Sequence, residues 1–537
     1  MTRQRLIHFL QRVPLVAWWF LGFFLLLSAY EYGRILHLRP LPHHLWRQTN
    51  CLSLTYEFYS GEWNLFKPRL QSLIADGGTT GYSAGEFPIM YYLIGMIWKI
   101  TGPSEFIYRT IMLALLAWGS WALCRIVHLL MDDRFWGVMI GLLFFTIPTV
   151  VYFGIGFLTD VPALSLILAG SLAFLLYLKS ESPKQLVLGS SLFALGMLLK
   201  ISAAMLPLAI LFVCIASLVL PHCFPWPSIK RKQIINIASG VAIGLVLMAA
   251  WVGYSIHYNN IHGAEYSYQG TWAYWDLPDD EADRAWTFGY TILIHQFFTI
   301  PVYILLLVSG AYLALNLRTL PTALILMLTV LILGVTLYLL LWFITLDNHD
   351  YYYVEPLVLP FAVILALLWY MRKYWDWAIR SPWAKLLFFS LLAHQALFAM
   401  NNIRMKQQDF SMADILGTSG VEQGHWHLTQ YWDFEGLLDI EPIARQHGIS
   451  KDDLVVTVPD NSVCLALYLS GQRGFNEFGG ITIRCPQLVE RAKQGAKYLY
   501  LIEKQPVIRD QLTACLGDPL FVHKEISVYD IRMLASQ

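Results

Sequence analysis

The chain has 537 residues, of which 57% are hydrophobic and 14% charged, and its formal net charge is zero. So small a charged fraction excludes a soluble protein of ordinary composition, and the balanced charge gives no indication of a nucleic-acid partner. Many windows of about 18 to 25 residues contain no charge, a pattern typical of repeated transmembrane helices. The sequence therefore predicts a polytopic α-helical membrane protein.

The first hydrophobic run, near 14–30, follows Arg3, Arg5 and Arg12. A signal peptide begins in the same way, but no small-residue cleavage site follows, so we expect an uncleaved first helix. With the spans that come after it, the total is about eleven. The further spans are expected near 104–131, 135–154, 161–178, 185–199, 202–220, 234–257, 298–317, 322–345, 354–371 and 385–401. The bias of basic residues predicts a cytoplasmic N-terminus and an outward loop over 31–103.

Two outward stretches are too long to be simple connections. Within the loop 31–103, the apolar part 87–100 is too short for a span, so we expect a helix lying at the outer interface. The loop 261–299 mixes Tyr, Trp and acidic residues, and long ordered loops of this kind usually carry function. We therefore expect it to form a second wall of a site built on the first loop.

From about residue 401 the composition becomes that of a soluble domain. Strand and helix patterns alternate there, which predicts a small α/β unit: strands at 453–458, 497–502 and 526–531, and a helix at 486–494. An odd number of spans places this unit outside the cytoplasm. The predicted division is a transmembrane domain over 1–403 and an extracytoplasmic domain over 404–537, in a multi-pass protein of the inner (plasma) membrane.

The chain has seven cysteines. Three of them lie in the polar tail, Cys464, Cys485 and Cys515, and they could include one disulfide if the tail is outside the cell. Their spacing resembles no zinc site. Gly479-Gly480 lacks the spacing of a nucleotide-binding fingerprint.

Charged side chains gather beside the membrane in the first outer loop. Arg47 offers a fork of donors suited to phosphate, and outside the cell such a phosphate would most simply belong to a lipid. A headgroup anchor is the alternative. Glu86, just before Phe87-Pro88, suits a chemical role or a helix N-terminus. His43 and His44 are candidates for acid–base chemistry or for ligands, with a plain surface role as the alternative.

Further polar residues fall at the same membrane face. Asp160 begins a span, where an N-cap would explain it, although acids at membrane depth tend to mark function. Lys200 lies between two outward span ends, where an anion partner or snorkelling would explain it. The turn 347–353 carries hydrogen-bonding groups and aromatic faces that suit a sugar or a headgroup. The convergence of these groups on one face favours a site.

The order of these features resembles the GT-C class of polytopic glycosyltransferases, in the superfamily of protein mannosyltransferases and lipid A aminoarabinose transferases. The resemblance covers the transmembrane part together with an outward C-terminal domain. Each motif is short, and their order and topology together carry the resemblance. They are Trp46-Arg47-Gln48-Thr49-Asn50, Gly61-Glu62-Trp63-Asn64, Gly85-Glu86-Phe87-Pro88-Ile89, Thr159-Asp160-Val161-Pro162-Ala163, Leu198-Leu199-Lys200 and His349-Asp350-Tyr351-Tyr352.

The resemblance implies an enzyme that takes a sugar from a polyprenyl-phosphate or diphosphate carrier and attaches it, with inversion, to a lipid, glycan or protein acceptor on the outer face. It implies no nucleotide cofactor and leaves a divalent cation open, and the sequence shows no convincing metal-ligand set. A carboxylate, Glu86 or Asp160, would deprotonate the acceptor, while Arg47 and Lys200 would hold the leaving phosphate. Substrate binding would fall to His44, Trp46, Gln48, Asn50, His349, Asp350 and Tyr352.

Asn50 departs from the family pattern W-R-Q-x-D. Asn cannot act as a general base, so the base role moves to Glu86 or Asp160. The alternatives are a lipid or solute transporter or flippase, an oligosaccharyl transferase or polysaccharide ligase, and an inactive relative in an envelope assembly. Transporters often show repeated halves and charges near the middle of the membrane, and neither feature is evident in this sequence.

Overall fold

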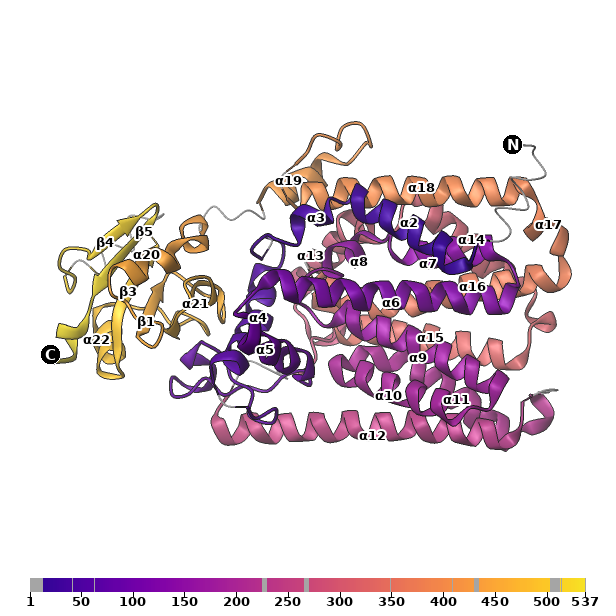
Figure 1. The fold of residues 1–537 in the computed structure, drawn as a ribbon, viewed down its shortest axis with the longest axis horizontal. Coiled ribbons are helices and arrows are strands. Elements are labelled where there is room, and N and C mark those ends of the chain that lie inside the picture. Colours follow the sequence, from indigo (N-terminus) through magenta and orange to yellow (C-terminus); the bar gives the residue numbers. More distant parts are fainter. Residues whose placement is uncertain are drawn as a thin grey trace.

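The structure is a computed structural model that describes residues 13–536, apart from 41, 62, 225–228, 265–269, 348, 408, 429–433, 503–511 and 513. Long helices lie side by side in a bundle, and a small domain with a sheet stands at one end of it (Figure 1). Helices dominate because an apolar segment in a bilayer must satisfy its backbone hydrogen bonds internally.

Each span predicted from the sequence corresponds to helical structure. The span predicted over 135–154 is divided in two, because Pro148 lacks an N–H and begins a new helix. The helices of the bundle are α2 (Leu15–Ala29), α6 (Glu105–Met131), α7 (Arg134–Phe144), α8 (Pro148–Phe153), α9 (Asp160–Ser180), α10 (Pro183–Leu199), α11 (Met205–Val219), α12 (Arg231–His262), α14 (Ile300–Leu315), α15 (Thr322–Leu341), α16 (Val358–Tyr374), α17 (Asp376–Arg380) and α18 (Pro382–Met405).

Within the described residues, seven helical segments are long and apolar enough to cross a membrane. They are Glu105–Met131, Asp160–Ser180, Ile201–Val219, Arg231–His262, Thr322–Leu341, Asp350–Tyr374 and Pro382–Met405. The other predicted spans form shorter apolar helices, namely α2, α7, α10 and α14. The polytopic α-helical class is thereby confirmed, and the exact number of spans stays a prediction.

The first outer loop folds into helices at the end of the bundle nearest to the sheet domain (Figure 1). These helices are α3 (Tyr32–Ile35), α4 (Leu45–Ser60) and α5 (Ile89–Thr101). Helix α5 packs closely on α4, because Gly95 leaves room for the backbone of α4: a Cβ at this position would lie 2.9 Å from Phe58 Cβ and from the Thr55 carbonyl oxygen. The loop predicted over 261–299 contains α13 (Asp279–Thr291).

The C-terminal domain is built on a mixed sheet with strand order β2-β1-β3-β5-β4. The first three neighbours are parallel, and β5 is antiparallel to both β3 and β4. The sequence analysis missed β2 and β4, since three residues are too few to show a period of two. The elements are β1 (Leu454–Val458), α21 (Leu465–Leu469), β2 (Arg473–Phe475), α22 (Cys485–Lys493), β3 (Ala496–Ile502), β4 (Phe521–His523) and β5 (Ile526–Asp530).

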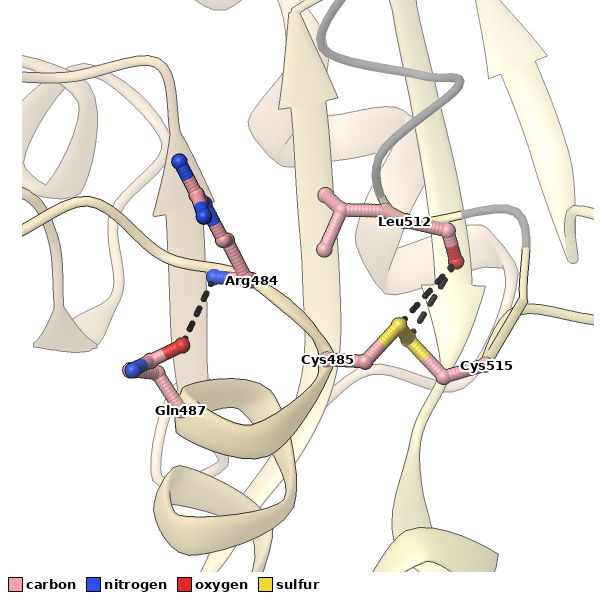
Figure 2. The surroundings of a disulfide bond; sticks show 5 residues. All are labelled: Arg484, Cys485, Gln487, Leu512 and Cys515. Carbon is pink, nitrogen blue, oxygen red and sulfur yellow. Dashed lines mark hydrogen bonds between the residues drawn. A yellow bond between two sulfur atoms is a disulfide. The ribbon is translucent and has the colours of Figure 1, made fainter.

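A disulfide joins Cys485, the first residue of α22, to Cys515 (Figure 2). One disulfide among the three cysteines of the tail was expected from the sequence, and Cys464 is the buried free thiol of the three.

The sheet domain is tied to the first outer loop by buried polar contacts. Glu57 of α4 is almost fully buried and forms ion pairs with Arg69, at 2.5 Å, and with Arg473 of β2, at 3.2 Å. Ser72 pairs with Gly474 as a parallel β-bridge, so the loop extends the edge of the sheet. A polar junction of this kind fixes the domain against α4.

Along the chain, α19 (Gly420–Leu428) follows α18 and lies beside its end (Figure 1). Its Trp426 ring contacts the His43 ring edge to face. A short helix, α20 (Ile440–Gln446), then precedes β1. Since α18 runs to Met405, the boundary predicted after residue 403 falls within its last turn.

Candidate active site

Four charged residues from distant parts of the chain meet at the end of the bundle near the sheet domain. Arg47, in the first turn of α4, forms an ion pair with Glu86. Lys200, directly after α10, places Nζ 2.8 Å from Asp160 Oδ1 and 3.8 Å from Glu86 Oε1. The two cations and two acids that the sequence analysis named separately thus form one cluster.

The backbone around Glu86 is held from two sides. The N–H of Phe87 donates to the carbonyl oxygen of Leu198 at 3.1 Å, which ties the segment to the end of α10. On the other side, the Asn259 amide of α12 both donates to and accepts from the backbone of Ala84, at 2.8 Å each way. The backbone that carries Glu86 is therefore anchored to the end of α10 and to α12.

Asp160 does not serve as a helix cap. The N-cap of α9 is Thr159, which makes no side-chain cap bond and donates its hydroxyl to the Leu199 carbonyl oxygen at 3.3 Å. The Asp160 side chain is 0% exposed and faces Lys200. Asp160 therefore stands behind Lys200 as a buried counter-charge.

The electrostatics keep Glu86 and Lys200 charged. Burial alone would raise the pKa of Glu86, but the positive charges of Arg47 and Lys200 hold it below its usual range. Burial alone would lower the pKa of Lys200, but the negative charges around it, led by Asp160 and Glu86, raise it well above its usual value. Glu86 and Lys200 thus keep opposite charges although both side chains are largely buried.

A third acid, Glu355, lies close enough to Lys200 to interact with it electrostatically. It lies fully buried in the short 3-10 helix Glu355–Leu357. The rings of Tyr352 and Tyr351 cover the ammonium group at 4.9 and 5.5 Å. Glu355 was not predicted from the sequence, although an acid inside an otherwise apolar stretch is itself a signal of function.

A second cluster forms around Asp350, whose side chain is almost fully buried. His43 Nε2 lies 3.1 Å from Asp350 Oδ1, and His44 Nε2 lies at the same distance from the same oxygen. Lys406 Nζ donates to Asp350 Oδ2 at 3.2 Å. His44 adopts the left-handed conformation with φ 54°, a strained state for a residue with a side chain, and so both imidazoles face one carboxylate.

Three ligand atoms from His43, His44 and Asp350 lie within 4.8 Å of one another. Two imidazoles and a carboxylate suit zinc or iron, and the sequence analysis did not single out this set. However, the ammonium of Lys406 already supplies the positive charge that Asp350 needs, and both Nε2 atoms contact the same carboxylate. These residues therefore fit a closed ion-pair network better than a metal centre.

The other predicted substrate-binding residues occupy different settings. Gln48 is buried and donates to the His43 carbonyl oxygen at 2.7 Å, so it supports the second cluster. His349 lies beside His44, and its Nδ1 contacts the Asp347 carbonyl oxygen at 2.9 Å. Trp46 and Asn50 lie on α4 and line a large cavity.

A large cavity, about 1610 Å³, opens onto the first cluster. Arg47, Glu86 and Lys200 lie on its wall, with the second cluster's His43 and His44 nearby. One part is apolar and runs between α11, α12 and α15, where it is lined by Leu208, Phe212, Met248, Val252, Leu333 and Leu337. The other part reaches the outer loops and the sheet domain, at Trp272, Glu281, Arg284, Val463, Leu465 and Phe478.

Comparisons with known proteins find a family match and similar folds. Residues 85–254 match the family described as dolichyl-phosphate-mannose-protein mannosyltransferase, and this segment contains Glu86, Asp160 and Lys200. No curated protein matches the chain by sequence. Among solved structures, ArnT from Cupriavidus metallidurans in the apo state is similar over 97% of this chain and 99% of its own, with a TM-score of 0.54 and 14% identity.

The same ArnT bound to undecaprenyl phosphate is similar over 96% of this chain and 98% of its own, with a TM-score of 0.55 and 14% identity. The chain has the fold of ArnT. The GT-C architecture predicted from the sequence is thereby confirmed. The ArnT fold includes both the helical part and the C-terminal sheet domain, because the similarity extends over nearly the whole of both chains.

Proposed function

We propose that this protein is a membrane glycosyltransferase that moves a sugar from a polyprenyl-phosphate donor to an acceptor hydroxyl on the non-cytoplasmic face. The observation that carries the proposal is one cavity that joins an apolar channel between helices to the Arg47–Lys200 cation pair. A lipid phosphate has both of these parts. The ArnT fold supports the proposal, since ArnT itself was solved with undecaprenyl phosphate.

The donor fits the cavity in one orientation. Its polyprenyl chain lies between α11, α12 and α15, where apolar side chains line the wall. Its phosphate then reaches Arg47 and Lys200, of which the first can offer two parallel N–H donors. The sugar points toward the outer loops and the sheet domain, where the acceptor enters. The acceptor is a lipid, a glycan or a protein.

The chemistry is an in-line displacement. Glu86 accepts the proton of the acceptor hydroxyl as its oxygen attacks the anomeric carbon from the side opposite the phosphate. The bond between that carbon and the phosphate oxygen breaks, and the phosphate leaves with the electron pair. Arg47 and Lys200 offset its growing negative charge. Attack from the opposite side inverts the anomeric carbon.

Glu86 is favoured over Asp160 as the base because it lies on the cavity wall, whereas Asp160 is enclosed behind Lys200. Asp160 and Glu355 act as positioning residues that hold the ammonium of Lys200 toward the cavity. Asn50 lines the same cavity from α4. The loss of an acid at that position is compatible with transfer if Glu86 supplies the carboxylate.

The site faces the non-cytoplasmic side in this proposal. Basic residues concentrate at the end of the bundle marked by α17, which lies opposite the sheet domain (Figure 1). Such residues favour the cytoplasm. The Cys485–Cys515 disulfide favours an oxidising compartment for the sheet domain. We therefore place the protein in the inner (plasma) membrane with residues 404–537 outside.

The decisive test is sugar transfer in proteoliposomes without any nucleotide sugar. Purified protein is given a panel of polyprenyl-phosphate sugars, labelled in the sugar, with envelope lipids and glycans as acceptors. We expect a labelled product with a new glycosidic bond, and its loss in Arg47→Ala and Lys200→Ala. Label that crosses the bilayer still attached to its carrier would instead establish the transporter alternative.

A further inference from the structure

The Glu86 carboxylate occupies the place that a phosphate needs. Its Oε1 atom pairs with Arg47 and lies 3.8 Å from Lys200 Nζ, so one acidic oxygen stands between the two cations. The three side chains are similarly exposed to the cavity, at 17% for Arg47, 18% for Glu86 and 11% for Lys200. An incoming phosphate oxygen and the Glu86 oxygen would therefore seek the same donors.

Lys200 has a second acidic partner on its buried side. Lys200 keeps Asp160 at 2.8 Å on its buried side when Glu86 moves away. Arg47 has its ion pair with Glu86 on the cavity side. An incoming phosphate can therefore reach Arg47 from the cavity, the side on which Glu86 now contacts it.

We propose that Glu86 is a stand-in for the donor phosphate: it holds Arg47 in place while the site is empty, and phosphate binding displaces it to become the base for the acceptor. This inference rests on the proposed function. The backbone of residues 84–87 is anchored to α10 and α12, so the displacement is a rotation of the side chain alone.

The electrostatics give the displacement a chemical purpose. Burial raises the pKa of Glu86, and Arg47 is the first of the charges that lower it. When Arg47 turns to the phosphate, the charge that lowers the pKa of Glu86 most is withdrawn, and the carboxylate becomes a stronger base. Donor binding would thus activate the base, and an empty site would hold a weak one.

The test measures how tightly the wild type and two variants bind undecaprenyl phosphate, in nanodiscs of neutral lipid at fixed ionic strength. Removing the competing charge in Glu86→Gln should make binding roughly tenfold tighter, because a like charge beside the phosphate is gone. Glu281→Gln is the matched control, since Glu281 lines the same cavity on α13. It removes one negative charge from the cavity without touching Arg47, and its affinity should match that of the wild type.

Three outcomes overturn the inference. If Glu86→Gln and the wild type bind with equal affinity, the carboxylate stays on Arg47. If Glu86→Gln binds more weakly, the carboxylate helps to hold the phosphate. If Glu86→Gln and Glu281→Gln both bind more tightly to the same extent, the effect is one of general charge. If the wild type itself does not bind undecaprenyl phosphate, the proposed function fails as well. A structure of the wild type with this lipid decides independently of any variant: Glu86 must have left Arg47.

Discussion

Two buried charge clusters lie next to each other in this protein, and they are built differently. In the first, Glu86 is shared between Arg47 and Lys200 and all three side chains reach the cavity. In the second, Asp350 is enclosed and takes contacts from His43, His44 and Lys406. The ammonium of Lys406 is further covered by the rings of Tyr152 and Trp426, each at 4.8 Å.

This difference suits the first cluster to catalysis and the second to structural support. A charged group can take part in a reaction if it can exchange one ion-pair partner for another without becoming an unpaired buried charge. A carboxylate whose oxygens are all occupied in a dry site can only hold its neighbours, because loss of any partner leaves an unpaired buried charge. We therefore expect substitutions in the first cluster to change transfer and those in the second to change stability.

The largest effect is expected from Glu86→Gln. Loss of a general base typically lowers the rate by about 10²–10⁴-fold, so kcat should fall by this order although donor binding becomes tighter. Asp160→Asn should act through Lys200 and mainly raise KM for the donor. Steady-state transfer kinetics in proteoliposomes separate the two. A normal kcat in Glu86→Gln would remove this residue from the mechanism.

Lys406→Met should leave the rate constant of the folded protein nearly intact and lower its stability. Lys406 is fully buried on Asp350, and breaking one side of a buried pair costs about 3–5 kcal/mol. Lys385→Met is the control, because its pair with Asp133 is partly exposed and should cost about 1 kcal/mol or less. The apparent Tm of each variant in detergent measures these losses of stability. An equal decrease in Tm for Lys406→Met and Lys385→Met would contradict a structural role for the second cluster.

Much of this architecture can be read from the sequence, and the part that cannot has a physical reason. Arg47, Glu86, Asp160 and Lys200 were each recognisable as charges at one membrane face, and the structure shows that they meet. Lys406 follows a long apolar helix and resembles an ordinary interfacial lysine. Only the tertiary fold brings it to Asp350, 56 residues away along the chain. Pairings of this kind depend on packing and leave no local pattern.

A pH dependence should come from Glu422, which faces the second cluster. Burial raises its pKa to about 7, and Gln296 donates to its Oε1 atom at 3.3 Å. The pKa of Glu422 is 4.5 in its ordinary state and about 7 in the folded protein, so between these pH values the folded protein binds more protons than the unfolded chain. The free energy of unfolding should therefore fall as the pH rises from 4.5 to about 7, by up to about 3 kcal/mol.

Glu422→Gln should remove this dependence, so that its apparent Tm changes less than that of the wild type between acidic and mildly alkaline buffer. Glu490→Gln, on the exposed face of α22, is the control and should follow the wild type. If Glu422→Gln and wild type lose stability in parallel, another group carries the effect.

The smallest effect tests the shape of the phosphate site rather than its charge. Arg47→Lys keeps one positive charge but loses the planar fork that can hold two phosphate oxygens at once. We expect undecaprenyl phosphate to bind roughly tenfold more weakly, or about 1.4 kcal/mol. Arg39→Lys is the matched control: Arg39 pairs with Glu105 at 3.1 Å in the same outer region. If Arg47→Lys bound the lipid like the wild type, a point charge at this position would be sufficient for phosphate binding. Lys200 alone would then set the position of the phosphate.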